Sequence, residues 1–162
     1  MLEFMNSSIK YLTYRKIRDR HYKEENIRMK TEGGTDLNKW YVQPYSFLKA
    51  IFYIECGSFL VYLLQYTSVT PNFLTINYIL LGFLGGIFLS IDNSSLILIA
   101  TIIFFSKSIL DWSDGLLARI KKKTSELGSL LDSWGGLVGD YSFISGLGVY
   151  LFNKYQSIHF YI

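Results

Sequence analysis

This chain of 162 residues has one cysteine, a small net charge and no evident internal repeat. Cys56 is the single cysteine, so an intramolecular disulfide is excluded, and a small apolar core side chain is the simpler interpretation. The net charge is only +3, and the basic residues flank apolar runs. We therefore expect no nucleic acid as a partner, because positive charge beside apolar segments is typical of membrane topology. No repeat or low-complexity segment stands out, and residues 1–11 lack the uninterrupted apolar core of a cleavable signal peptide.

Apolar residues, by contrast, are abundant. Hydrophobic residues make up 50% of the chain and aromatic residues 17%, and long apolar runs follow Tyr45. Such runs indicate segments embedded in a membrane. The sequence predicts an all-α integral membrane protein with about three transmembrane helices, preceded by an interfacial amphipathic helix. The predicted spans run from Pro71 to about Ser90, from Leu96 to Trp112 and from Gly128 to about Leu151.

The chain divides into four predicted regions. Residues 1–42 form a polar cytosolic tail with room for one short helix, and residues 43–66 form an interfacial or re-entrant helix. A transmembrane domain covers residues 70–152, and residues 153–162 form a short tail. The basic run 121–123 is expected in the cytosol, which places the N-terminal tail there only if residues 43–66 do not cross the membrane.

Three aspartates mark the boundary between the second and third predicted spans. Asp111 and Asp114 are three residues apart and share one face of a helix, and Asp132 opens the following span. Carboxylates at a membrane boundary repel one another, and a hard divalent cation lets them stay ionised. Mg²⁺ often combines a few carboxylates with substrate phosphates, which points to phosphoryl chemistry. Helix capping is the alternative for any one of these residues.

The segment that contains these aspartates resembles the signature of the CDP-alcohol phosphotransferase family, also called CDP-alcohol phosphatidyltransferases. That signature is Asp-x2-Asp-Gly-x2-Ala-Arg, a spacer, and then Gly-x3-Asp-x3-Asp. Pro71 and Asn72, followed by Thr75, are a second and weaker point of resemblance. The residues that match the signature are Asp111, Asp114, Gly115, Ala118, Arg119, Gly128 and Asp132.

The resemblance implies an enzyme of phospholipid or related polar-lipid synthesis. It would transfer a phosphate-linked group from a CDP-linked donor to an alcohol acceptor and release CMP, at a site that faces the cytosol. The implied cofactor is Mg²⁺ or Mn²⁺, and its implied ligands are Asp111, Asp114 and Asp132. Membrane lipids would surround the protein, and a homodimer is a further expected partner.

The remaining signature residues have implied roles in binding the nucleotide. Gly115 and Ala118 would let the nucleotide approach, with helix packing as the alternative for Ala118. Gly128 would let the nucleotide or a neighbouring helix come close. Arg119 would pair with an aspartate or a phosphate, or serve only as a topological charge.

Lys107 lies one turn before Asp111 and is not part of the signature. It would pair with an aspartate or a phosphate, or extend to the membrane interface.

Two departures from the family pattern leave alternatives open. One helical turn after Asp132 the family has an aspartate that binds metal and acts as general base, whereas this chain has Gly136. Asp140, a turn further on, is a candidate catalytic stand-in for that base; water or the acceptor's own phosphate is another, and loss of turnover is a third. The chain also supplies only about half of the family's usual helices. A fragment, a truncated relative and assembly from two chains are the interpretations, and a non-catalytic scaffold that binds metal and nucleotide is the alternative function.

Overall fold

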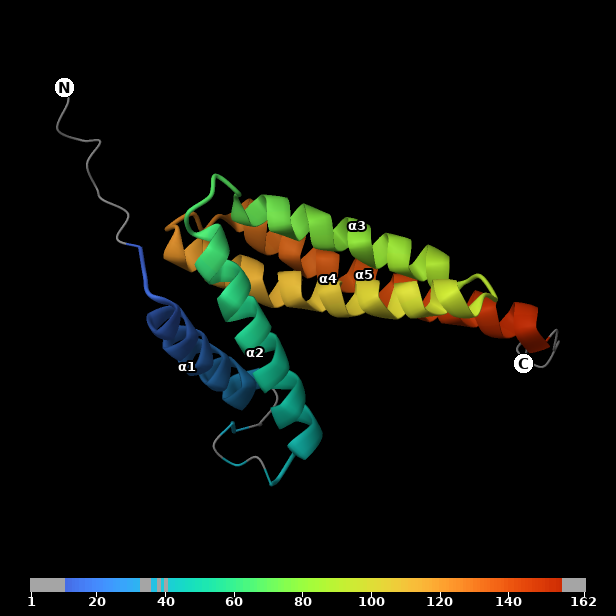
Figure 1. Ribbon diagram of the computed structural model, residues 1–162, viewed down its shortest axis with the longest axis horizontal. Helices are drawn as coiled ribbons and strands as arrows, with labels where there is room; N and C mark the ends of the chain where they lie inside the picture. The colour runs from blue at the N-terminus through green and yellow to red at the C-terminus, as the bar shows by residue number, and fades with distance from the viewer. Residues whose placement is uncertain (1–10, 33–35, 38, 40, 156–162) are drawn as a thin grey trace.

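The computed structural model describes residues 11–32, 36–37, 39 and 41–155. Its regular structure in this part of the chain consists of helices without strands, which confirms the predicted all-α class (Figure 1). The first ten residues of the predicted N-terminal tail, and residues 156–162 of the predicted C-terminal tail, lie outside the described residues. The helices are α1 (Tyr14–Glu32), α2 (Pro44–Leu64), α3 (Pro71–Leu89), α4 (Ser94–Ile120) and α5 (Glu126–Tyr155).

Helices α3, α4 and α5 run side by side and form a bundle in which α3 packs against both of its neighbours (Figure 1). Helix α3 starts at the predicted proline, and the side chain of Thr70 accepts a hydrogen bond from the backbone N–H of Phe73. Asn93 caps α4 in the same way. Helix α4 continues to Ile120, beyond the predicted end at Trp112, so the signature from Asp111 to Arg119 lies on an uninterrupted helix.

Glycines bring α3 and α5 into close contact. A side chain added at Gly86 would place its Cβ 2.5 Å from the carbonyl oxygen of Ser142, and one added at Gly146 would lie 2.4 Å from the carbonyl oxygen of Gly86. At Gly82 the nearest atom to such a Cβ is the Cα of Gly139, at 3.2 Å. The two backbones therefore approach more closely than any larger residue allows.

Three of the described helices are long and apolar enough to cross a membrane, which agrees in number with the prediction of about three spans. The set differs from the predicted one, because it contains α2, α3 and α4 rather than α3, α4 and α5. Helix α5 is the more polar helix, since it carries Asp132, Asp140 and six glycines. Helix α2 meets the criteria of length and composition despite its two charged residues, Lys49 and Glu55.

The direction of α2 nevertheless supports the predicted placement at the membrane interface. Helix α2 is steeply inclined to the α3–α4–α5 bundle, and the highly polar helix α1 lies along it (Figure 1). A membrane crossed by the bundle would therefore run roughly parallel to α2. Charged residues along α1 also favour a position next to water, because burying them in lipid is costly. The interfacial placement of α2 stays a prediction with this geometric support.

Helix α1 is longer and more firmly docked than the short helix expected in a polar tail. Its residues Ile17 and His21 are fully buried, and the Nδ1 atom of His21 lies 3.0 Å from the hydroxyl of Ser58 on α2. Burial, together with the positive charge of Arg119, lowers the pKa of His21 to about 4. The sequence pattern does not indicate the buried face that carries Ile17 and His21, because most residues of α1 are polar and its apolar periodicity is weak.

Glu55 of α2 holds the other side of α1. Its carboxylate accepts hydrogen bonds from the hydroxyls of Tyr14, at 3.0 Å, and Tyr22, at 2.7 Å. It also forms an ion pair with Arg18, at 2.6 Å. The hydrogen bond and charge of Glu55 raise the pKa of Arg18, while burial and then Glu55 raise the pKa of Tyr22 to about 12. The charge that interrupts the apolar run of α2 is therefore the anchor for α1.

We predict that Gly146→Ala destabilises the protein by about 1–3 kcal/mol, because the added methyl group would press on the backbone of Gly86. Gly148→Ala is the matched control on the same helix, since a Cβ there meets no atom within 4 Å. The control should be neutral or slightly stabilising, as alanine favours helix formation by about 1 kcal/mol over glycine. Thermal unfolding in detergent measures both, and equal melting temperatures for the two variants would contradict the close contact.

The buried His21 predicts that stability falls in mild acid. Its pKa is near 6.5 in an unfolded chain and about 4 in the folded protein, so below pH 6.5 the unfolded state binds the proton more strongly. The free energy of unfolding should fall by up to roughly 1.4 kcal/mol per pH unit between pH 6.5 and pH 5. His21→Gln should flatten this part of the profile. Parallel profiles for the two proteins would show that His21 is not the titrating group.

Candidate functional site

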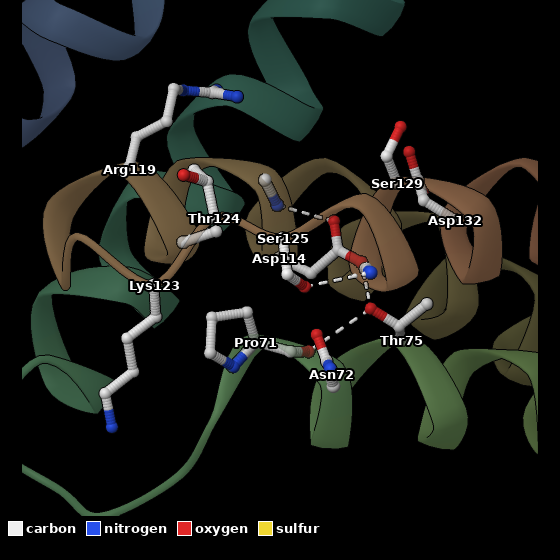
Figure 2. A pocket seen from close by; sticks show the side chains of 13 residues that line it. Pro71, Asn72, Thr75, Asp114, Arg119, Lys123, Thr124, Ser125, Ser129 and Asp132 are labelled. Carbon is white, nitrogen blue, oxygen red and sulfur yellow. Dashed lines mark hydrogen bonds between the residues drawn. The ribbon is translucent and has the colours of Figure 1, made fainter.

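A cavity of about 210 Å³ opens at one end of the bundle (Figure 2). It lies between the first turn of α3, the last turns of α4 and the first turns of α5. These segments are distant in sequence and carry the predicted signature, so the fold brings most of that signature to one place. The lining residues are Pro71, Asn72, Thr75, Asp114, Gly115, Ala118, Arg119, Lys123, Thr124, Ser125, Gly128, Ser129 and Asp132.

Asp114 is the buried acid of the cavity. Its side chain is almost inaccessible, and Oδ2 accepts a hydrogen bond of 2.5 Å from the hydroxyl of Thr75 on α3. Its other oxygen accepts from the backbone N–H of Gly115. Thr75 is itself buried, and Figure 2 shows its hydroxyl directed at Asp114. The carboxylate is thereby fixed from two sides, which orients it for binding a ligand.

Asp132 lies on the opposite wall, on α5, and is held by Tyr78 of α3. The buried Tyr78 donates a hydrogen bond of 2.7 Å to Oδ1 of Asp132, and its hydroxyl lies 3.0 Å from the backbone carbonyl oxygen of the same residue. The ring of Tyr78 fits because Gly135 has no side chain, since a Cβ there would lie 2.4 Å from the ring. Helix α3 therefore supplies one hydroxyl to each of the two acids that line the cavity.

Asp111 is the third predicted ligand, and it does not line the cavity in this structure. Its Oδ2 lies 3.6 Å from the Nζ atom of Lys107, one turn earlier on α4. Lys107 is buried next to Gly139, and its ammonium group also lies 5.3 Å from the centre of the Tyr78 ring. The structure thus shows the aspartate pairing that was one of two interpretations of this lysine. All three aspartates still interact electrostatically, because Asp111 and Asp132 both act on Asp114.

Arg119 pairs with a residue that the signature does not contain. Its Nε atom donates a hydrogen bond of 2.7 Å to Oε2 of Glu24 on α1. Its Nη1 atom lies 3.1 Å from the position that a Cβ would take at Gly115. The space above Gly115, which we had assigned to an approaching nucleotide, therefore borders the guanidinium group of Arg119.

The basic residues after α4 have different environments. Lys121 donates hydrogen bonds to the carbonyl oxygens of Thr67 and Val69, at 2.8 and 2.7 Å, and so ties the end of α4 to the segment between α2 and α3. Burial, and then the charge of Lys123, lowers the pKa of Lys121. Lys123 lines the cavity, where its positive charge favours anionic ligands.

Gly136 and Asp140 are not among the residues that line the cavity. Gly136 has no atom within 4 Å of the Cβ that it lacks, so the space next to it is open. Asp140, the candidate stand-in base, is exposed and is not among the residues that line the cavity. Gly128 does line it, where a Cβ would lie 3.0 Å from the amide oxygen of Asn72.

The acids of the cavity fit a hard divalent cation such as Mg²⁺ or Mn²⁺. Among the residues that the structure describes, no three His, Cys, Asp or Glu side chains are arranged to hold a metal ion. Asp114 and Asp132 face one cavity, however, and Mg²⁺ commonly binds through one or two carboxylates plus the phosphates of a substrate. The donor set therefore suits an ion that arrives with a phosphorylated ligand better than a permanently caged one.

The fold and the cavity define a class: an all-helical membrane protein with two acids of facing helices at a polar site. Comparison with known proteins identifies the family, because the pattern described as CDP-alcohol phosphatidyltransferase matches residues 68–158, more than half of the chain. The chain belongs to this family. The match begins just before α3, so α1 and α2 lie outside it.

One curated relative supports this assignment over a shorter stretch. CDP-diacylglycerol–glycerol-3-phosphate 3-phosphatidyltransferase of Haemophilus influenzae is 42% identical over 64 residues, which cover 38% of this chain and 34% of the relative. The chain therefore spans about a third of the length of the relative that it matches. No solved structure matches the chain.

We predict that Thr75→Val destabilises the protein by about 1–3 kcal/mol, because the buried Asp114 carboxylate loses a hydrogen bond while the side-chain volume is kept. Thr75→Ser should retain most of the stability. Thr101→Val on α4 is the matched control, since that exposed threonine bonds only to the carbonyl oxygen of Ile97 within its own helix. Thermal unfolding compares the variants, and an equal effect at both threonines would contradict the role of Thr75.

Proposed function

We propose that this chain transfers a phosphate-linked group from a CDP-linked donor to an alcohol acceptor, with release of CMP. The observation that carries the proposal is one cavity that joins Asp114 and Asp132 to four other signature residues, Gly115, Ala118, Arg119 and Gly128. Membership of the CDP-alcohol phosphatidyltransferase family supports the reaction class. The matched relative is named for CDP-diacylglycerol and glycerol 3-phosphate, so these are the first donor and acceptor to test.

In this reaction, the hydroxyl oxygen of the acceptor attacks the phosphorus that carries the donor's alcohol group. The bond between that phosphorus and the oxygen of CMP breaks, and the acceptor hydroxyl loses its proton. A bound Mg²⁺ or Mn²⁺ would neutralise charge on the pyrophosphate. Asp114 and Asp132 would hold the ion, and Asp111 would complete the ligand set that the resemblance implies.

Other residues of the cavity would bind and orient the donor. Arg119 and Lys123 offer positive charge to its phosphates, and Asn72, Ser125 and Ser129 offer amide and hydroxyl groups. Gly115, Ala118 and Gly128 keep the wall of the cavity free of large side chains. Glycine at 136 leaves the usual proton acceptor unassigned, with Asp140, water and the acceptor's phosphate as candidates.

We further propose that the cavity and the N-terminal helix face the cytosol. Support comes from the basic run 121–123, which lies at the cavity end of the bundle, and from the basic character of α1. A homodimer is a further proposal that the family resemblance alone supports.

Gly136 and the short matched length favour a second candidate function. In this alternative the chain is a non-catalytic or truncated relative that binds metal and nucleotide as a scaffold. The space next to Gly136 is open, so restoring an aspartate there meets no steric obstacle. The Gly136→Asp variant therefore distinguishes a site that lacks only its general base from a site that lacks other catalytic groups as well.

We predict that membranes carrying this chain release CMP from CDP-diacylglycerol when glycerol 3-phosphate and Mg²⁺ are present. Asp114→Asn or Asp132→Asn should lower the rate by about a hundredfold or more, because each removes a charge that would bind the ion. Asp92→Asn, at the far end of the bundle, is the matched control and should leave the rate unchanged.

The Gly136→Asp and Asp140→Asn variants distinguish the remaining alternatives. If Asp140 is the base, Asp140→Asn should lower the rate by about a hundredfold. If the missing aspartate limits turnover, Gly136→Asp should raise the rate. A third result is that neither the natural chain nor the Gly136→Asp variant releases CMP while both still bind CDP. That result would overturn the proposed enzymatic function and support the non-catalytic scaffold.

A further inference from the structure

The N-terminal helix α1 reaches the candidate site although it lies outside the region that matches the family. Glu24 of α1 is the acceptor for Arg119, and the two residues are far apart in sequence. Glu24 also pairs with Arg20 of its own helix, at 2.6 Å. Its carboxylate thus lies between two guanidinium groups, one from α1 and one from the wall of the cavity.

Helix α1 holds Glu24 in a fixed position. Ile17 and His21, on one face of the helix, are fully buried against α2 and α4. Residues on a neighbouring face bond to Glu55 of α2 through two tyrosine hydroxyls and one arginine. Since two faces of α1 are anchored in the turns just before this position, Glu24 is presented by a docked helix rather than by a mobile side arm.

Arg119 is directed at Glu24 rather than at a carboxylate of its own helix. Without it, the nearest carboxylate on the same helix is Asp114, which lines the same cavity. An arginine turned toward Asp114 would neutralise a carboxylate that the proposed reaction needs for its cation. In the structure, Nε of Arg119 bonds to Glu24, and the remaining end of the guanidinium lies over Gly115 at the cavity wall. Figure 2 shows the guanidinium of Arg119 well apart from the carboxylate of Asp114.

We propose that Glu24 is a positioning residue for the donor site: it holds Arg119 at the cavity wall, where Nη1 and Nη2 can bind a phosphate of the CDP-linked donor. This inference rests on the proposed function and extends it to a helix that the family match does not include. A guanidinium offers several N–H donors, so Arg119 can bond to Glu24 through Nε and still bind a phosphate oxygen.

The test measures the affinity of the purified full chain for CDP and for cytidine, in detergent with Mg²⁺. Glu24→Gln keeps the size of the side chain but removes its charge, and it should weaken CDP binding by about threefold to tenfold because the pair is partly exposed. Cytidine has no phosphate, so its affinity should not change. Glu24→Asp should restore part of the CDP affinity. Asp19→Asn, an exposed acid on the same helix, is the matched control.

A second comparison asks whether Glu24 acts through Arg119. In a double-mutant cycle, Glu24→Gln should have no further effect on CDP affinity once Arg119→Gln is present. Additive effects, or equal losses for CDP and cytidine, would mean that Glu24 only stabilises the fold, and the inference would fall. Normal CDP binding by Glu24→Gln would overturn it while leaving the proposed function intact. Failure of the natural chain to bind CDP would overturn both.

Discussion

The backbone contact between α3 and α5 is the constraint on which the candidate site depends. Gly86 and Gly146 allow the two helices to touch, and the same close approach continues along them through Gly82 and Gly139. At this separation the ring of Tyr78 fits over Gly135, and its hydroxyl reaches Asp132. A wider spacing between the helices would remove that hydrogen bond and move one acid away from the other. Close packing of two helix backbones thus determines the geometry of a polar site.

Helix α3 carries few charged or reactive groups, yet it orients both acids of the cavity. Thr75 bonds to Asp114 on one neighbouring helix, and Tyr78, one turn later, bonds to Asp132 on the other. Because α3 packs against both α4 and α5, two hydroxyls on one helix set the relation between residues of two others. Such supporting hydrogen bonds fix ligand orientation before a substrate arrives, which lowers the cost of ordering the site on binding.

The sequence predicted the parts of the structure that depend on local pattern and composition. Pro71 marked the start of α3, and the resemblance to the family signature implied that Asp114 and Asp132 would belong to one site. The partners of these residues were not predictable in the same way. Tyr78 reads as one more aromatic residue in an apolar run, and Glu24 as one charge among many on a polar helix. Their roles come from tertiary contacts between distant segments, for which one sequence gives no local signal.

The placement of α1 shows the same limit of sequence patterns. Its high polarity suggested a solvated tail, because the buried face consists of a few residues, one of them a histidine. Arg18 and two tyrosines of α1 bond to the charged Glu55 of α2. Polar residues that disfavour burial of an isolated helix therefore favour its docking when a partner is present. The sequence of neither helix alone indicates this docking. The presence of Glu55 within the apolar run of α2 is explained only when α1 and α2 are considered together.

Glu55 also has a consequence for how the chain enters a membrane. The insertion machinery reads segments in order of synthesis, and α2 on its own is apolar enough to be taken as a spanning segment. Helix α1 is made before α2, so the two tyrosines and the arginine that bind Glu55 are present when α2 emerges. If α2 lies at the membrane surface as predicted, pairing with α1 would keep the glutamate ionised there and would oppose insertion of α2 across the bilayer. In that case an interaction between the first two helices would set the orientation of every later helix.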